Sequence, residues 1–231
     1  MDEIGHTHTD VSGGWLRPAV FGAMDGLVTN IALVAGVGGG GASSTVIILS
    51  GMAGLVAGAF SMALGEYASV ETQNNAVRAE VATERHELRT NPRAEEAELV
   101  DMYVEMGLSR ETAERAAAEV HADPELAVRV HITQELGVNP DEQPSPVVAG
   151  VSSFLCFAVG GLFPLVPFLL GSDSLLLGLL VGGVGLFAAG ALVSQFTTRS
   201  WWYNGVRQLV FGAVAAGATY LVGMLIGVGV S

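Results

Sequence analysis

Four long stretches of this 231-residue chain contain no Asp, Glu, Lys, Arg or His: residues 26–65, 147–172, 174–198 and 208–231. An apolar helix needs about 20 residues to span the hydrocarbon core of a bilayer. The first stretch has 40 residues, which is enough for two spans, and each of the others has room for one. The sequence therefore predicts an all-α membrane protein with five transmembrane helices. It excludes a soluble enzyme, a secreted module and a disordered chain.

The ten basic residues are all Arg, and their positions predict the orientation of the spans. They lie before the first span, between the second and third spans, or between the fourth and fifth. Because basic residues are retained on the cytoplasmic side, we expect the N-terminus and residues 71–145 in the cytoplasm and the C-terminus outside. The first dozen residues are polar and acidic, whereas a signal peptide begins with basic residues followed by an apolar run.

The same pattern predicts four segments. These are a polar N-terminal tail (1–17), transmembrane helices one and two (18–75), a cytoplasmic acidic helical metal-binding subdomain (76–145) and transmembrane helices three to five (146–231). Asn91-Pro92 ends the first helix of the subdomain, Ser109 and Asp123-Pro124 begin two more, and Gly137 ends the last. In the third span, Pro164 and Pro167 predict a broken helix end.

The charge balance is strongly acidic. The chain has no Lys and a net charge of −13, and residues 71–145 hold 17 acids against 7 Arg. Such a surface repels nucleic acid and attracts cations. A general solvating role for the acids is the alternative. The single cysteine, Cys156, lies in an apolar run, so neither an intramolecular disulfide nor a cysteine-based metal site is expected.

Three residues of the first two spans are candidates for an ion path. Asp25 lies within the first span, where a carboxylate by default marks an ion path. Met62 and Glu66 are four residues apart on the second span and therefore share a helix face. A thioether beside a carboxylate suits a borderline metal. The alternatives are acids at the membrane interface and a methionine in the core.

The subdomain carries acidic pairs at helical spacing. One Glu-x-x-Glu pair lies before the Asn91-Pro92 break and a second lies after it. The last helix adds a histidine and a glutamate four residues apart. Oxygen ligands with one imidazole suit Mn²⁺ or Fe²⁺, although a solvated acidic face is the alternative. The proposed ligands are Glu84, Glu87, Glu95, Glu98, His131 and Glu135. His86 and His121 are expected at the surface, and His6 and His8 in a flexible tail.

Several runs resemble the vacuolar iron transporter family. They are MDGLVTNIALVAGV, GAFSMALGEYASVETQ, the acidic insert ending in ITQELGV, and PSPVVAGVSSFLCFAVGGLFPLVPF. The resemblance implies five transmembrane helices and a homodimer with the ion path at the subunit interface. It also implies export of Fe²⁺ or Mn²⁺ from the cytoplasm in exchange for protons. The family's ion-path residues match Asp25 and Met62, and its metal-binding glutamates match Glu84, Glu87, Glu95, Glu98 and Glu135.

The chain departs from the better-known eukaryotic members at two places. Gly54 stands where they carry a glutamate, and an acid is found instead at Glu66 in GEYAS. The last helix of the insert carries a methionine and additional glutamate in those members, and the nearby residues here are His131 and Ile132. Proton coupling and metal preference therefore do not carry over directly. The GEYAS form is similar to prokaryotic and nodulin-like members, which implies a prokaryotic plasma membrane.

The resulting prediction is an exporter of divalent iron or manganese, serving metal homeostasis, that is not an enzyme. Its partners are divalent metal ions, protons, the lipid bilayer and a second copy of the chain, and the metal is cargo rather than a prosthetic group. The alternatives are a membrane-anchored metal sensor and a ferritin-like iron oxidase. Di-iron bundles use Glu-x-x-His pairs, and the one such pair here is Glu3 with His6 in the tail.

Overall fold

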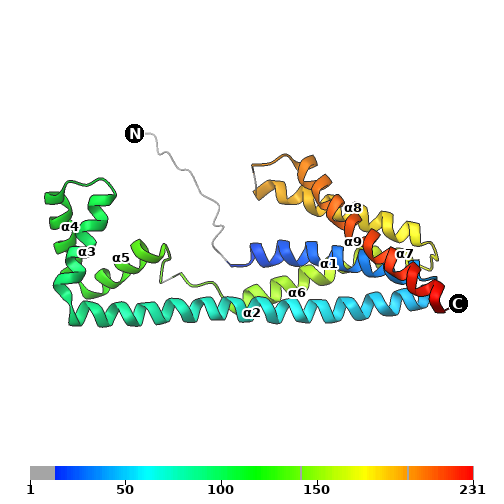
Figure 1. Ribbon diagram of the computed structural model, residues 1–231, viewed down its shortest axis with the longest axis horizontal. Coiled ribbons are helices and arrows are strands. Elements are labelled where there is room, and N and C mark those ends of the chain that lie inside the picture. The colour runs from blue at the N-terminus through cyan, green and yellow to red at the C-terminus, as the bar shows by residue number, and fades with distance from the viewer. Residues whose placement is uncertain (1–13, 141, 197, 231) are drawn as a thin grey trace. The chain divides into compact units, whose positions relative to one another are not determined.

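The computed structural model describes residues 14–140, 142–196 and 198–230, and the described chain is built from helices (Figure 1). The elements are α1 (Leu16–Gly39), α2 (Ser44–Thr90), α3 (Pro92–Glu105), α4 (Arg110–His121), α5 (Pro124–Leu136), α6 (Pro146–Leu162), η1 (Phe163–Leu165), α7 (Val166–Leu169), α8 (Leu175–Val193), η2 (Ser194–Phe196) and α9 (Trp201–Val230). Two compact units are present. Of the described residues, one unit holds those up to Ser69 and those from Ser145 onward, and the other holds those of Val70–Pro144.

Five helical segments of the described residues are long and apolar enough to cross a membrane. They are Leu16–Gly39, Ser44–Thr90, Pro146–Leu169, Leu175–Phe196 and Trp201–Gly227. The predictions of an all-α fold and of five spans are therefore confirmed. The second of these segments is part of α2, which runs without interruption to Thr90 and ends at the predicted Asn91-Pro92 break. The cytoplasmic placement of residues 76–145 stays a prediction.

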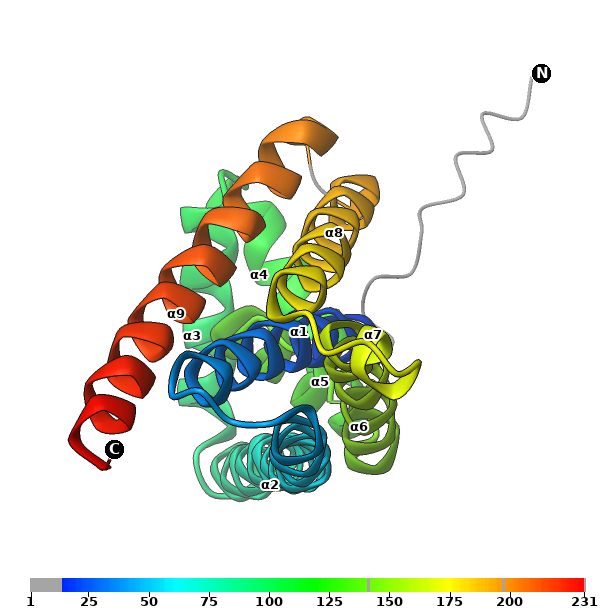
Figure 2. The ribbon, with the colours of Figure 1, turned by 90° about the vertical axis from the view of Figure 1, so that its right-hand side faces the viewer.

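Helix α1 is the central element of the first unit and packs against α6, α8 and α9 (Figure 2). Glycine allows the close approach. A Cβ on Gly22 would lie 2.6 Å from the carbonyl oxygen of Ser153 on α6, and one on Gly26 would collide with that of Phe157. On the other side, a Cβ on Gly223 of α9 would collide with the carbonyl oxygen of Gly36. In lipid, such small residues allow helix backbones to pack directly.

Gly51 and Gly58 of α2 lie against side chains of neighbouring helices rather than against their backbones. A Cβ on Gly51 would meet the side chain of Leu165, and one on Gly58 would meet the ring of Phe157. These positions therefore make room for large side chains of the third span rather than for a neighbouring backbone. The spacing of small residues alone does not distinguish the two uses, because both require a missing Cβ.

The third span is interrupted where its prolines predict. Helix α6 ends at Leu162, and the chain continues as the 3-10 turn η1 and the short helix α7. Pro164 has no N–H to donate to Gly160, whose carbonyl instead accepts from the N–H of Phe163. The next carbonyl, that of Gly161, accepts a 2.7 Å hydrogen bond from Nδ2 of the fully buried Asn30. A side chain of α1 thus satisfies a carbonyl at the break.

The second unit contains the end of α2 and the helices α3, α4 and α5. The Ser109 side chain caps α4 by accepting from the N–H of Thr112, and Asp123 caps α5 by accepting from two backbone N–H groups. Gly137 ends α5 with a φ of 65°, a left-handed conformation that glycine adopts without strain. These boundaries match the predicted ones. A small apolar core of Leu99, Val100, Ala113 and Ala117 joins α3 to α4.

Candidate metal centre

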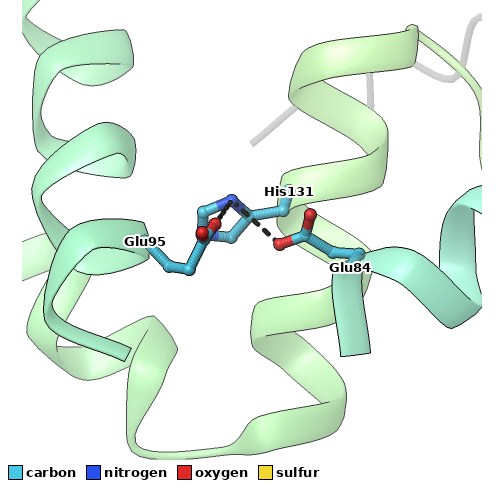
Figure 3. A group of neighbouring side chains, drawn as sticks. All are labelled: Glu84, Glu95 and His131. Carbon is cyan, nitrogen blue, oxygen red and sulfur yellow. Dashed lines mark ion pairs between the residues drawn. The ribbon is translucent and has the colours of Figure 1, made fainter. Parts of the chain in front are cut away.

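Three helices of the second unit bring a histidine and two glutamates together. Glu84 comes from α2, Glu95 from α3 and His131 from α5, and one ligand atom of each lies within 4.8 Å of the others (Figure 3). All three residues are buried. Their side chains point toward one another from separate elements, so the turn at Asn91 and the capped start of α5 are what assemble the group.

His131 is the centre of this arrangement, and its side chain is 0% exposed. Its Nδ1 lies 3.3 Å from Oε1 of Glu84, 3.8 Å from Oε2 of Glu95 and 3.3 Å from Oε1 of Glu135. One nitrogen therefore faces carboxylates from three helices. Oxygens of this kind with one imidazole nitrogen form a suitable donor set for a divalent transition metal.

The electrostatics of Glu84 also favour a cation. The pKa of Glu84 is raised from 4.5 to about 7, mostly by burial and then, in that order of importance, by the charges of Glu135, Glu95, Glu98 and Glu87. The pKa of Glu95 is raised by burial and then by Glu98. Oε1 of Glu84 accepts no hydrogen bond from the described residues. A bound divalent ion would compensate both the repulsion and the unsatisfied oxygen.

Two of the six predicted ligands lie at the periphery. Glu98 is exposed, and Glu87 is half-buried and accepts a 2.7 Å hydrogen bond from Nδ2 of Asn91. Both act on the central group through their charge, because each raises the pKa of Glu84. The structure brings the other four into one group: Glu84, Glu95, His131 and Glu135. The role of all six as metal ligands stays a prediction.

The prediction that His121 lies at the surface is wrong. This residue, the last of α4, is half-buried, and its Nε2 lies 3.1 Å from Nε2 of His131. The two rings meet edge to face, with centroids 5.3 Å apart. No helical periodicity relates positions in α4 and α5, so the sequence carried no signal for this contact. His86 is exposed, as expected, and His6 and His8 lie outside the described residues.

The candidate ion-path residues lie in the first unit. Asp25 is half-buried and accepts a 3.4 Å hydrogen bond from Oγ1 of Thr29. Met62 is half-buried, and Glu66 is 8% exposed. Oε2 of Glu66 accepts no hydrogen bond from the described residues and lies 3.8 Å from Nη1 of Arg17.

Helices α1 and α2 approach each other at two places in this region. A Cβ on Gly54 would lie 3.4 Å from Oδ1 of Asn30, and Arg17 forms the ion pair with Glu66. Along their helices, Asp25 of α1 and Met62 of α2 both lie between these two places. No hydrogen bond or ion pair joins Asp25 to Glu66 among the residues that the structure describes.

A model of the VIT family matches residues 16–224, which include the first four spans, most of the fifth and the metal-centre residues. The chain belongs to the VIT family. Two relatives named vacuolar iron transporter support this membership. The protein of Acanthamoeba castellanii is 34% identical, covering 97% of this chain and 84% of the relative, and that of Toxoplasma gondii is 30% identical, covering 95% and 78%.

A third relative, vacuolar iron transporter 2 of Oryza sativa subsp. japonica, is 27% identical and covers 95% of this chain and 90% of its own length. The resemblance found in the sequence runs is thereby confirmed. With its five apolar helices, this VIT family chain is a membrane protein. The second unit, the first four spans and most of the fifth lie within the region that the family model matches.

Proposed function

We propose that this VIT family chain exports divalent iron or manganese from the cytoplasm. The observation that carries the proposal is the buried group of Glu84, Glu95 and His131, in which one imidazole nitrogen faces several carboxylates. The names of the relatives, which are vacuolar iron transporters, support metal as the cargo. The donor set suits Fe²⁺ and Mn²⁺ better than Cu⁺, which prefers soft sulfur ligands.

The second unit captures metal in this proposal, and the spans conduct it. Asp25, Met62 and Glu66 form the path through the membrane. A proton and a metal ion compete for the same carboxylate, so protonation of Asp25 or Glu66 from the far side releases the metal. Export is thereby coupled to proton entry. Oε2 of Glu66 is buried, accepts no hydrogen bond from the described residues and lies 3.8 Å from Nη1 of Arg17, so a metal ion that binds this oxygen takes the place of the Arg17 ion pair.

The proposal includes the assembly and orientation that the sequence predicts. Two copies of the chain form a homodimer with the path at their interface. The N-terminus and residues 71–145 face the cytoplasm, and the C-terminus faces away, as the distribution of Arg indicates. The membrane is a prokaryotic plasma membrane. Metal is the cargo, and no prosthetic group or catalytic step is required.

Transport by proteoliposomes tests the proposal. Purified full-length chain is reconstituted, a pH gradient is imposed, and uptake of Fe²⁺ and Mn²⁺ is measured for the unvaried protein and for Asp25→Asn. Asp173→Asn is the matched control, because Asp173 also belongs to the first unit but is exposed between the helices α7 and α8. We expect uptake to be lost in Asp25→Asn and retained in Asp173→Asn.

Two results would contradict the proposal. Full uptake by Asp25→Asn would remove Asp25 from the path. Metal binding without uptake by the unvaried protein would instead favour a sensor or a store. The ratio of Fe²⁺ to Mn²⁺ uptake identifies the preferred cargo, and uptake with and without the pH gradient tests the coupling.

A further inference from the structure

The contact between two histidine rings at the metal centre has no counterpart in the predicted ligand set. His131 presents Nδ1 to the carboxylates and Nε2 to Nε2 of His121, at 3.1 Å. This distance is that of an N–H···N hydrogen bond, in which one ring donates and the other accepts. Because His131 is fully buried, both of its nitrogens need partners within the protein.

We propose that His121 is a positioning residue of the metal centre: its Nε2 accepts a hydrogen bond from the Nε2–H of His131 and so leaves Nδ1 of His131 unprotonated for the metal. The proposal rests on the proposed function, since it requires a metal at this group. It assigns a role to a residue that makes no contact with the metal itself.

A histidine nitrogen binds a metal only when it carries no proton. If Nδ1 of His131 is the ligand, the neutral ring carries its proton on Nε2, and that N–H requires an acceptor. Nε2 of His121 lies at hydrogen-bond distance. Metal-binding histidines generally donate their second N–H to such a partner, which orients the ring.

His121 can serve as the acceptor only while it is neutral. The neutral ring then has one nitrogen with a proton and one without. A neutral His121 that carries its proton on Nδ1 presents the lone pair of Nε2 to His131.

The same pair of rings can also provide hydrogen-bond partners for both nitrogens of His131 when no metal is bound. With Nδ1 of His131 protonated, that N–H faces the carboxylate oxygens of Glu84 and Glu135, and Nε2 accepts from the Nε2–H of His121. Each ring holds one proton in both arrangements, so the direction of the hydrogen bond reverses without a change in the charge of the pair. No side chain has to move for the lone pair of Nδ1 to become available.

The hydrogen bond from His131 to His121 should affect which metals the centre prefers. An available imidazole nitrogen favours transition metals over Mg²⁺ and Ca²⁺, which prefer oxygen ligands. Without an acceptor at position 121, the buried Nε2–H of His131 is unsatisfied in the metal-bound state. Loss of His121 is therefore expected to weaken binding of Co²⁺ and Mn²⁺ and to leave weak binding of Mg²⁺ to the carboxylates unchanged.

The test uses calorimetric titration of the full-length chain in detergent with Co²⁺, Mn²⁺ and Mg²⁺. His121→Leu removes the acceptor, and His121→Gln retains an amide oxygen that can accept at a similar place. His86→Leu is the matched control, because His86 is exposed. We expect His121→Leu to weaken Co²⁺ binding by about tenfold, within the range for partners of metal-bound histidines. We expect His121→Gln to restore most of the affinity and His86→Leu to have no effect.

The visible absorption of bound Co²⁺ supplies a second measurement, since it responds to loss of a nitrogen ligand. Thermal unfolding of the metal-free variants establishes that His121→Leu is folded. An unchanged Co²⁺ affinity and spectrum in His121→Leu would overturn the proposal. Equal weakening in His121→Leu and His121→Gln with an unchanged spectrum would also overturn it, because the role of His121 would then be packing alone.

A further variant separates this inference from the proposed function. If Glu84→Gln and the unvaried protein bind Co²⁺ equally, no metal occupies the group of Glu84, Glu95 and His131, and the proposed metal centre is wrong. If Glu84→Gln weakens binding while His121→Leu does not, the metal centre stands and only the role of His121 is wrong.

Discussion

Oε1 of Glu84 lies 3.3 Å from Nδ1 of His131, although the two residues belong to α2 and α5 and two further helices separate these elements in the chain. Glu95 and Glu135 complete a group in which one buried imidazole faces three carboxylates. A carboxylate in such a place responds to protons and to metal ions by the same mechanism, because either one relieves the repulsion. Both the metal affinity and the stability of this unit should therefore depend on pH.

Metal binding to the full-length protein is expected to weaken as the pH falls. The pKa of Glu84 is raised to about 7, so this side chain is mostly ionised at pH 8 and mostly protonated at pH 6. Because the metal must displace the proton, the affinity for Mn²⁺ should fall by about tenfold for each pH unit below 7. Calorimetric titrations between pH 6 and 8 measure the change. Glu84→Gln should bind more weakly and lose this part of the dependence, and a pH-independent affinity in the unvaried protein would contradict the prediction.

The metal-free protein is expected to become less stable as the pH rises. Glu84 ionises near pH 4.5 in the unfolded chain and near 7 in the folded one. Between these values the folded state binds more protons at Glu84, so the contribution of Glu84 to stability is greatest below about pH 4.5 and is lost as the pH rises to about 7. The unfolding temperature of the metal-free protein in detergent, compared at several pH values between 5 and 8, measures this. The slope should be smaller in Glu84→Gln. An identical slope in both proteins would show that Glu84 makes no contribution.

Glu95 and Glu98 should differ in their importance, although both belong to the same predicted pair. Glu95 is buried and lies 3.8 Å from His131, whereas Glu98 is exposed and acts only through its charge. Glu95→Gln should weaken Mn²⁺ binding by about tenfold or more, the range in which loss of a fixed partner affects a metal site. Glu98→Gln should have a smaller effect that decreases with added salt, because exposed charges are screened. Equal losses in the two variants would contradict the described arrangement.

Close packing between α1 and α6 should make Gly26 intolerant of a side chain. A Cβ at Gly26 would collide with the carbonyl oxygen of Phe157, and backbone cannot move aside as a flexible side chain can. Gly26→Ala should destabilise the protein by about 1–3 kcal/mol, as overpacking does. Gly217→Ala is the control, since nothing lies within 4 Å of a Cβ there. The unfolding temperature in detergent should fall only in Gly26→Ala, and equal temperatures for both variants would refute the close approach.

Much of the fold could be predicted because its signals are local. A charge-free run identifies a span without reference to the rest of the chain. In the same way, Asn91-Pro92 and Gly137 identify the ends of helices. The position of Pro164 likewise predicts the interruption of the third span, since a missing N–H has the same effect wherever the helix lies.

The candidate site could be predicted only in part, because burial and contact between helices are not local. The spacing of Glu95 and Glu98 places both on one face of α3 but does not show that only Glu95 is buried. The approach of His121 to His131 depends on how α4 and α5 cross at the cap formed by Asp123. The ion pair of Arg17 with Glu66 depends in the same way on the packing of α1 beside α2.

The glycine-lined contact between α1 and α6 restricts how the membrane unit can move. Gly22 and Gly26 bring the two backbones so close that rotation of either helix about its own axis would drive a bulkier neighbouring residue into the other. The two helices therefore have to travel as one rigid body, with Asp25 carried along on α1. By contrast, Gly51 and Gly58 of α2 face the side chains of Leu165 and Phe157, which can change rotamer where a backbone cannot.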